Sequence, residues 1–192
     1  MAIIQNKTLI LLIDFHGHPI LGDDHTNNLR YSELMYFLNE QQFQYNIVSN
    51  HLKGEHTTER GPNKLRELKR IVDIEGVHNW DVIDPDREPA PSIEEIENIF
   101  KNRNYRINNV ILGGTNLAGC VLRSKPYSAI HWAKRGYRTQ IYLPMCADYE
   151  LPGVNQVERM MAATSVMYNV IREERLWRYI DLVRERNGLA KF

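Results

Sequence analysis

Two side chains of this sequence combine a reactive type with a position that suits hydrolytic chemistry. Cys120 follows a glycine-bearing turn, GGTNLAG, at the predicted first turn of a helix. A helix N-terminus favours negative charge and therefore the nucleophilic thiolate. Asp14 directly follows the apolar run from Thr8 to Ile13, where it could take the proton of a nearby thiol. Both residues also have a structural interpretation, since a free cysteine is often a small buried side chain and an aspartate often caps a loop.

The segments around these residues alternate between predicted strands and predicted helices. Short apolar runs predict strands over residues 8–13, 45–48, 80–83, 109–112 and 139–143. Helical spacing and caps predict helices over 29–42, from Pro62, from Ser92 with Glu95 as its capping-box partner, and over 120–135, 154–170 and 173–186. This alternation predicts an α/β fold with a mostly parallel sheet covered on both faces. Ligands bind at the carboxyl ends of such strands, so Asp14 and Cys120 should meet there.

Composition and charge argue against several classes of partner. The 192 residues suit a single domain, 1–192, and 24 basic residues balance 24 acidic ones. A formal net charge of zero draws the chain to neither nucleic acid nor an anionic membrane, and it leaves little repulsion against a homo-oligomer. No apolar run reaches the length of a membrane span, and no signal peptide is recognisable. We therefore expect a cytoplasmic protein that forms a homo-oligomer and acts on a small molecule.

Cofactor and metal motifs are not found in the sequence. GGTNLAG lacks the G-x-G-x-x-G spacing of dinucleotide folds, and no GK[ST] follows it. The two cysteines and seven histidines show no recognised ligand spacing. We therefore expect neither a cofactor nor a metal, and only His16, close to Asp14, is retained as a candidate site histidine.

The two stretches that carry Asp14 and Cys120 resemble the signatures of isochorismatase-like cysteine hydrolases. LILLIDFHGHP is similar to the family's first strand, which ends in Asp, a large apolar residue and usually Gln. NNVILGGTNLAGCVLRSKPYSAIHWAKRGYRTQIYLPMCADY is similar to its second signature, in which a strand, a Gly, a short turn and Cys-Val precede a helix, another strand and an Ala-Asp turn. Gly114, Cys120, Gly136 and Asp148 stand at matching places, and the resemblance covers residues 7 to 170.

The resemblance implies a three-layer α/β/α, Rossmann-like fold that is often oligomeric. Members such as nicotinamidases and carbamoylases cleave amide or carbamoyl bonds through a covalent thioester. Cys120 would be the nucleophile and Asp14 its general base, supported in the family by a lysine. The turn before the cysteine would hold the oxyanion, and residues near Asp14 and in the proline-rich loop would line the substrate pocket. The turn residues are Gly114, Thr115, Asn116 and Gly119, and the pocket residues are Phe15, His16 and Arg87.

Two departures from the family pattern bear on activity. His16 stands where glutamine is usual, and the lysine expected within residues 83–86, shortly before Ser92, is missing. Lys53 or Arg87 could supply the charge from elsewhere in space. Otherwise the chain would be a catalytically impaired member that binds a ligand or a partner.

The glycine turn also permits a second alignment. If Gly113 is the family glycine, Gly119 takes the place of the cysteine, as in the isochorismatases themselves. Those enzymes hydrolyse a vinyl ether without a cysteine nucleophile. In that case Asp14 would act alone.

Overall fold

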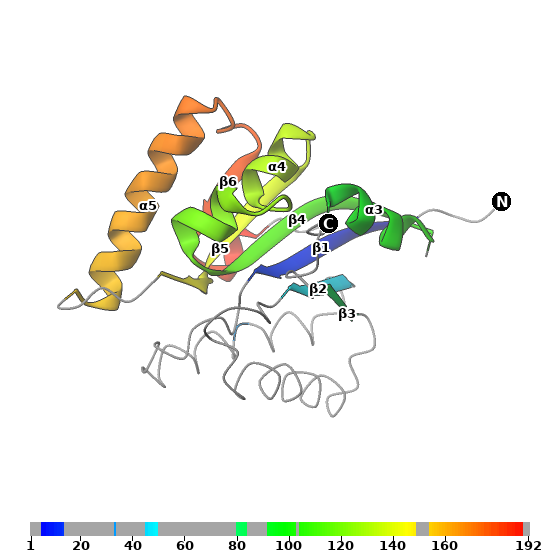
Figure 1. Cartoon of the computed structure of the whole chain (residues 1–192), viewed down its shortest axis with the longest axis horizontal. Helices are drawn as coiled ribbons and strands as arrows, with labels where there is room; N and C mark the ends of the chain where they lie inside the picture. The colour runs from blue at the N-terminus through cyan, green and yellow to red at the C-terminus, as the bar shows by residue number, and fades with distance from the viewer. Residues whose placement is uncertain are drawn as a thin grey trace.

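A computed structural model of the chain describes residues 5–13, 33, 45–49, 80–83, 92–102, 104–148 and 154–189. Within these residues, a sheet of six parallel strands has the order β3-β2-β1-β4-β5-β6 (Figure 1). The strands are β1 (Gln5–Ile13), β2 (Tyr45–Ser49), β3 (Trp80–Ile83), β4 (Tyr105–Thr115), β5 (Arg138–Ala147) and β6 (Ile180–Val183). The five strands predicted from the sequence are present, and β4 and β5 are longer than their apolar runs indicated.

The apolar run of β1 places this strand in the middle of the sheet. It pairs with β2 on one side and with β4 on the other. Its last five residues are fully buried, and alternate members, including Leu9 and Leu11, join the core beneath the described helices. Ile10 and Leu12 are equally buried on the other face. The strand is therefore apolar on both faces, as a strand covered by two layers must be.

Four helical segments cover one face of the sheet. They are α3 (Ile93–Asn102), the π-helix η1 (Leu117–Ser124), α4 (Ala129–Lys134) and α5 (Gln156–Glu173). No helix among the described residues is long and apolar enough to cross a membrane.

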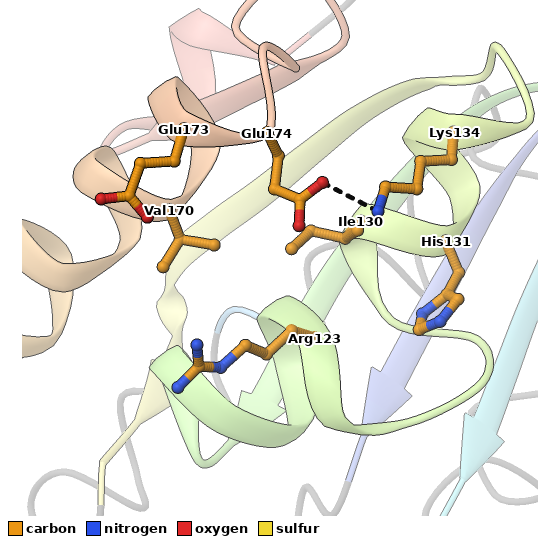
Figure 2. Close-up of a pocket in the computed structure, with 7 residues that line it drawn as sticks. All are labelled: Arg123, Ile130, His131, Lys134, Val170, Glu173 and Glu174. Atoms are coloured by element: carbon orange, nitrogen blue, oxygen red, sulfur yellow. Dashed lines mark ion pairs between the residues drawn. The ribbon is translucent and has the colours of Figure 1, made fainter.

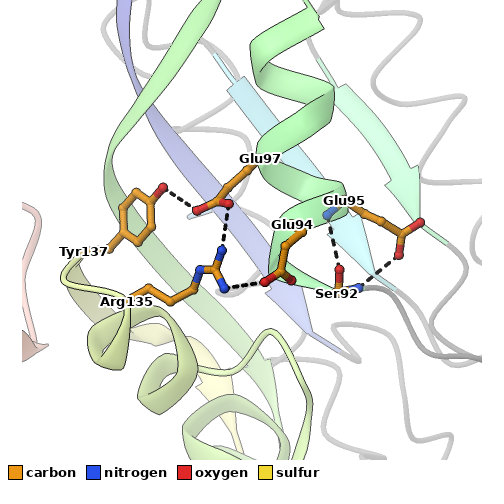
Figure 3. A network of polar contacts seen from close by, with 6 residues as sticks. All are labelled: Ser92, Glu94, Glu95, Glu97, Arg135 and Tyr137. Atoms are coloured by element: carbon orange, nitrogen blue, oxygen red, sulfur yellow. Dashed lines mark hydrogen bonds and ion pairs between the residues drawn. The ribbon is translucent and has the colours of Figure 1, made fainter.

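The start of α3 is the predicted capping box. The Ser92 N–H donates to Glu95 Oε2 over 3.1 Å, and the Glu95 N–H donates to Ser92 Oγ over 3.3 Å (Figure 3). Further along α3, Glu97 accepts hydrogen bonds from Arg135 and Tyr137, at 3.0 and 2.6 Å. These contacts join α3 to the segment that leads into β5.

Described residues also reach the opposite face. The Tyr142 hydroxyl, on β5, donates to the Glu33 carboxylate over 2.7 Å, and Glu33 is helical. Gln140 Nε2, on the same side of β5, donates to the Gly188 carbonyl over 3.2 Å, within the short 3-10 helix η2 (Arg186–Gly188). Described residues thus lie on both faces of the sheet, and the predicted α/β class with a parallel central sheet is confirmed. That the chain forms a single domain remains a prediction.

The predicted helix over 120–135 is wrong in its bounds, because the chain forms η1 and α4 with a turn between them. Pro126 explains the interruption. The residue before a proline is disfavoured in helical geometry, and Lys125 is extended, with φ −97° and ψ 148°. The predicted stop at Gly136 is confirmed, since this glycine has φ +87°.

The predicted helix over 173–186 is also wrong. α5 ends at Glu173, and Arg175 has φ +58°, a left-handed conformation that ends a helix. The chain then pairs as β6 with β5, its register placing Ile180 beside Thr139. In β6, Ile180 and Val183 are buried and Asp181 is exposed, and it is the pairing with β5 that makes the segment a strand. The high charge of this segment is what makes it look like a solvated helix face in the sequence.

Candidate active site

The strand order sets where a ligand would bind. The chain runs outward from β1 to β3 on one side of the sheet and from β4 to β6 on the other. In a doubly wound sheet, ligands bind outside the carboxyl ends of the strands where this order reverses. Here that point lies between β1 and β4, which end at Ile13 and Thr115. Asp14 and the turn before Cys120 are the next residues along the chain.

Register ties these strand ends together across the sheet. Ile13 pairs with Gly114, and Gly114 pairs with Cys146 of β5. Asp14 itself lies outside the described residues, as do Phe15, His16, Arg87 and Lys53, so the expected contact of Asp14 with Cys120 stays a prediction. The structure does show that the residue before Asp14 and the start of the cysteine turn belong to neighbouring, paired strands.

Two glycines allow the end of β4 to lie this close to its neighbours. A Cβ on Gly114 would stand 1.7 Å from the Ile13 carbonyl oxygen, and its φ of +138° is rarely adopted by other residues. A Cβ on Gly113 would stand 2.6 Å from the Met145 Cβ. Met145 belongs to an irregular stretch of β5 around Pro144, which has no N–H to donate to a ladder. Both positions need glycine, so this geometry is compatible with either alignment of the turn.

The turn after β4 builds the start of η1. Asn116 is its N-cap, and the Asn116 Oδ1 accepts the Gly119 N–H over 3.0 Å. A Cβ on Gly119 would lie 3.1 Å from the Asn116 side chain, so glycine at this position gives the cap its room. Of the four predicted oxyanion residues, Asn116 and Gly119 are therefore engaged with each other. An oxyanion could take the Gly119 N–H only in place of the Asn116 oxygen.

Cys120 is in η1, but three residues further into the helix than the sequence indicated. The helix begins at Leu117, which makes Cys120 its fourth residue. The side chain is half-buried and packs against the hydrophobic core. The first helical bond, from the Val121 N–H to the Asn116 carbonyl over 3.1 Å, has π-type spacing. π-helical turns are rare, and those that occur are often found at functional sites, which favours a functional role for this segment.

The second cysteine has a different environment. Cys146 is 4% exposed, and its thiol donates to the Tyr142 carbonyl over 3.2 Å. A thiol held inside the sheet in this way is poorly accessible to substrate or reagent. Asp148, half-buried, directly follows β5 at the same edge as the ends of β1 and β4. Its place after a strand resembles that of Asp14, and this signal could have added Asp148 to the candidate site.

Several charged groups are gathered in a pocket on the helical face. A pocket of about 480 Å³ lies between η1, α4 and α5 (Figure 2). It is lined by Arg123, Ile130, His131, Lys134, Val170, Glu173 and Glu174. Lys134 and Glu174 form an ion pair at 2.8 Å, and burial together with the Lys134 charge lowers the pKa of His131. Cys120 does not line this pocket. Among the described residues, no group of His, Cys, Asp and Glu could hold a metal ion.

Comparison with known proteins gives matches at the level of structure. No protein-family model and no curated protein matches the sequence. The nicotinamidase SaPncA from Staphylococcus aureus is similar in structure, with a TM-score of 0.49 and 13% identity over 93% of this chain and 98% of that one. MAR1 ribonuclease from Caenorhabditis elegans is also similar, with a TM-score of 0.46 and 16% identity over 88% of this chain and 75% of that one.

Proposed function

We propose that this chain is an isochorismatase-like hydrolase that cleaves an amide or carbamoyl C–N bond of a small molecule through a thioester on Cys120. The switch point of the sheet carries the proposal. β1, which Asp14 follows in the sequence, is paired with β4, which leads through Asn116 into the helix that holds Cys120. The half-burial of Cys120 adds support, since a nucleophile must be fixed in position by the protein and still be accessible to the substrate.

In the proposed reaction, the Asp14 carboxylate takes the proton of the Cys120 thiol, and the sulfur attacks the substrate carbonyl carbon. Donors at the start of η1 stabilise the resulting oxyanion. Asp14 returns the proton to the nitrogen as the C–N bond breaks, which leaves a thioester. Asp14 then deprotonates a water molecule, whose oxygen attacks the thioester carbon. The acid product leaves, and the proton goes back to the thiol.

The missing lysine sets the expected rate. A carboxylate beside a thiolate repels it, and the family relies on a lysine to offset that repulsion. Here the charge must come from Lys53, Arg87 or protonated His16. We expect ordinary amides such as nicotinamide to turn over slowly unless one of these cations approaches the pair.

Single substitutions test the proposal. The Cys120→Ala variant should lose turnover of every amide that the wild type cleaves, and the Asp14→Asn variant should lose it by about 100-fold or more. Cys146→Ala is the matched control and should keep wild-type rates, because its thiol is buried inside the sheet. Mass spectrometry of protein quenched during turnover should place the acyl mass on the peptide that contains Cys120. An active Cys120→Ala variant would refute the thioester.

A ligand-binding role is the second candidate, and one contact favours it. The Gly119 N–H is already bound by Asn116, so the start of η1 offers one donor fewer to an oxyanion. A wild-type protein that binds amides in calorimetry but turns none over would support this role. Turnover of a vinyl ether by the Cys120→Ala variant would instead support hydrolysis by Asp14 alone.

A further inference from the structure

Exposed apolar side chains are concentrated on and beside α5. In Figure 1 this helix lies at one side of the molecule and extends beyond the sheet. All the large hydrophobic side chains that are exposed among the described residues lie between positions 154 and 179. They are Val154, Val157, Met161, Val166, Tyr168, Trp177 and Tyr179. Such a concentration in one stretch of the chain, four of the seven on α5 itself, indicates an interaction surface, whereas scattered apolar residues would not.

α5 has more apolar surface than its own chain covers. Ala163 and Met167 are buried in the core and lie on the side that packs against η1. About 120° around the helix from them is a second row, formed by Val157, Met161 and Tyr168, whose exposed fractions are 68%, 69% and 53%. At 100° per residue these three positions fall within about 40° of each other. We refer to Val157, Met161 and Tyr168 as the α5 stripe.

Two members of the stripe, Met161 and Tyr168, can pair with each other when a second copy of the helix is reversed. The midpoint between them falls at Thr164 and Ser165, whose small side chains permit close approach of two helices. An antiparallel copy crossing there brings Met161 of each chain against Tyr168 of the other. The same crossing brings Glu158, in the first turn, opposite Arg172, in the last turn, and both residues are exposed. Antiparallel packing also aligns the two helix dipoles favourably.

We propose that the α5 stripe is the interface of a symmetric homodimer, in which α5 packs antiparallel against α5 of a second copy. The complementary charges at its two ends select another copy of this chain over an unrelated partner. The formal net charge of zero leaves little long-range repulsion between copies. Because one helix face is a small interface, the dimer should dissociate on dilution.

Paired substitutions on the same helix test the interface. Sedimentation velocity of the wild type across a concentration series should show a monomer–dimer equilibrium. Met161→Glu should raise the dissociation constant at least about tenfold, because it buries a charge between the copies. Val166→Glu is the matched control. Val166 is 44% exposed but lies about 140° around the helix from Met161, so this variant should dimerise like the wild type.

A charge exchange then tests the orientation of the two helices. Arg172→Glu should weaken the dimer by facing Glu158 with a like charge, and adding Glu158→Arg should restore it. Circular dichroism confirms that each variant is folded. A wild type that stays monomeric at several hundred micromolar would overturn the proposal. So would equal weakening by Met161→Glu and Val166→Glu, or a double variant no tighter than Arg172→Glu alone.

Discussion

Replacement of Gly114 by alanine should cost more stability than replacement of a glycine at an open turn, because Gly114 lies within β4 against β1. The new Cβ would lie 1.7 Å from the Ile13 carbonyl oxygen, so β1 and β4 must separate at the carboxyl edge. The positive φ of +138° adds backbone strain. Strain of about 1–2 kcal/mol and a packing cost of about 2–3 kcal/mol give a loss of about 3–5 kcal/mol. For a chain of this size that lowers Tm by roughly 10 °C.

Gly136→Ala separates the two contributions. Gly136 also has a positive φ, +87°, but no atom lies within 4 Å of the place where an alanine Cβ would stand. Only the backbone strain applies, so the expected loss is about 1–2 kcal/mol. Urea unfolding of both variants gives the difference directly, and Gly114→Ala should also lose turnover because the two strand ends move apart. Equal destabilisation by the two substitutions would show that β1 and β4 do not approach as closely as described.

Three further predictions concern side chains away from the site. Thr8→Val should raise stability by about 1 kcal/mol in urea unfolding, because the Thr8 hydroxyl is buried and has no hydrogen-bond partner in the described part of the chain. Burial raises the pKa of Glu33, but the hydrogen bonds and charge of Arg186 outweigh it, so the net pKa is lowered. The resulting stability is present above pH 4.5 and is lost as the pH falls through the folded-state pKa. Arg186→Gln should therefore cost about 0.5–1 kcal/mol at pH 7, after allowance for solvent screening, and progressively less as the pH falls through the folded-state pKa of Glu33. Burial, together with the hydrogen bond to Glu97, raises the pKa of Tyr137 from 10.0 to about 12. The folding free energy of the wild type should therefore decrease between pH 10 and 12, and that of Tyr137→Phe should decrease less over the same range.

The sequence predicted the central strands because their signals are local. The run that ends at Ile13 is too short for a membrane span and too apolar for a surface strand, so a central parallel strand was the remaining choice. Ser92 and Glu95 formed the predicted capping box for the same reason, since both partners lie within one turn. Alternation of strands and helices was enough to predict that the ends of β1 and β4 share one edge.

Features that depend on distant contacts were missed. The charged segment after Glu173 looked helical, and only its pairing with β5 makes Ile180–Val183 a strand. The need for glycine at position 114 arises from Ile13, about a hundred residues earlier in the chain, and no local pattern reports it. The break before α4 was different. Pro126 is a local signal for a helix end, but the prediction gave more weight to the helical spacing of the apolar residues around it.

The crystal structure of the wild-type protein tests the central claim most directly, through the distance between the Asp14 carboxylate and the Cys120 Sγ. The strand order and the pairing of Ile13 with Gly114 predict that these atoms lie within about 3–4 Å, or share one bridging water. A separation too large for one water to bridge, or an Asp14 side chain on the far side of the sheet edge from η1, would contradict the account.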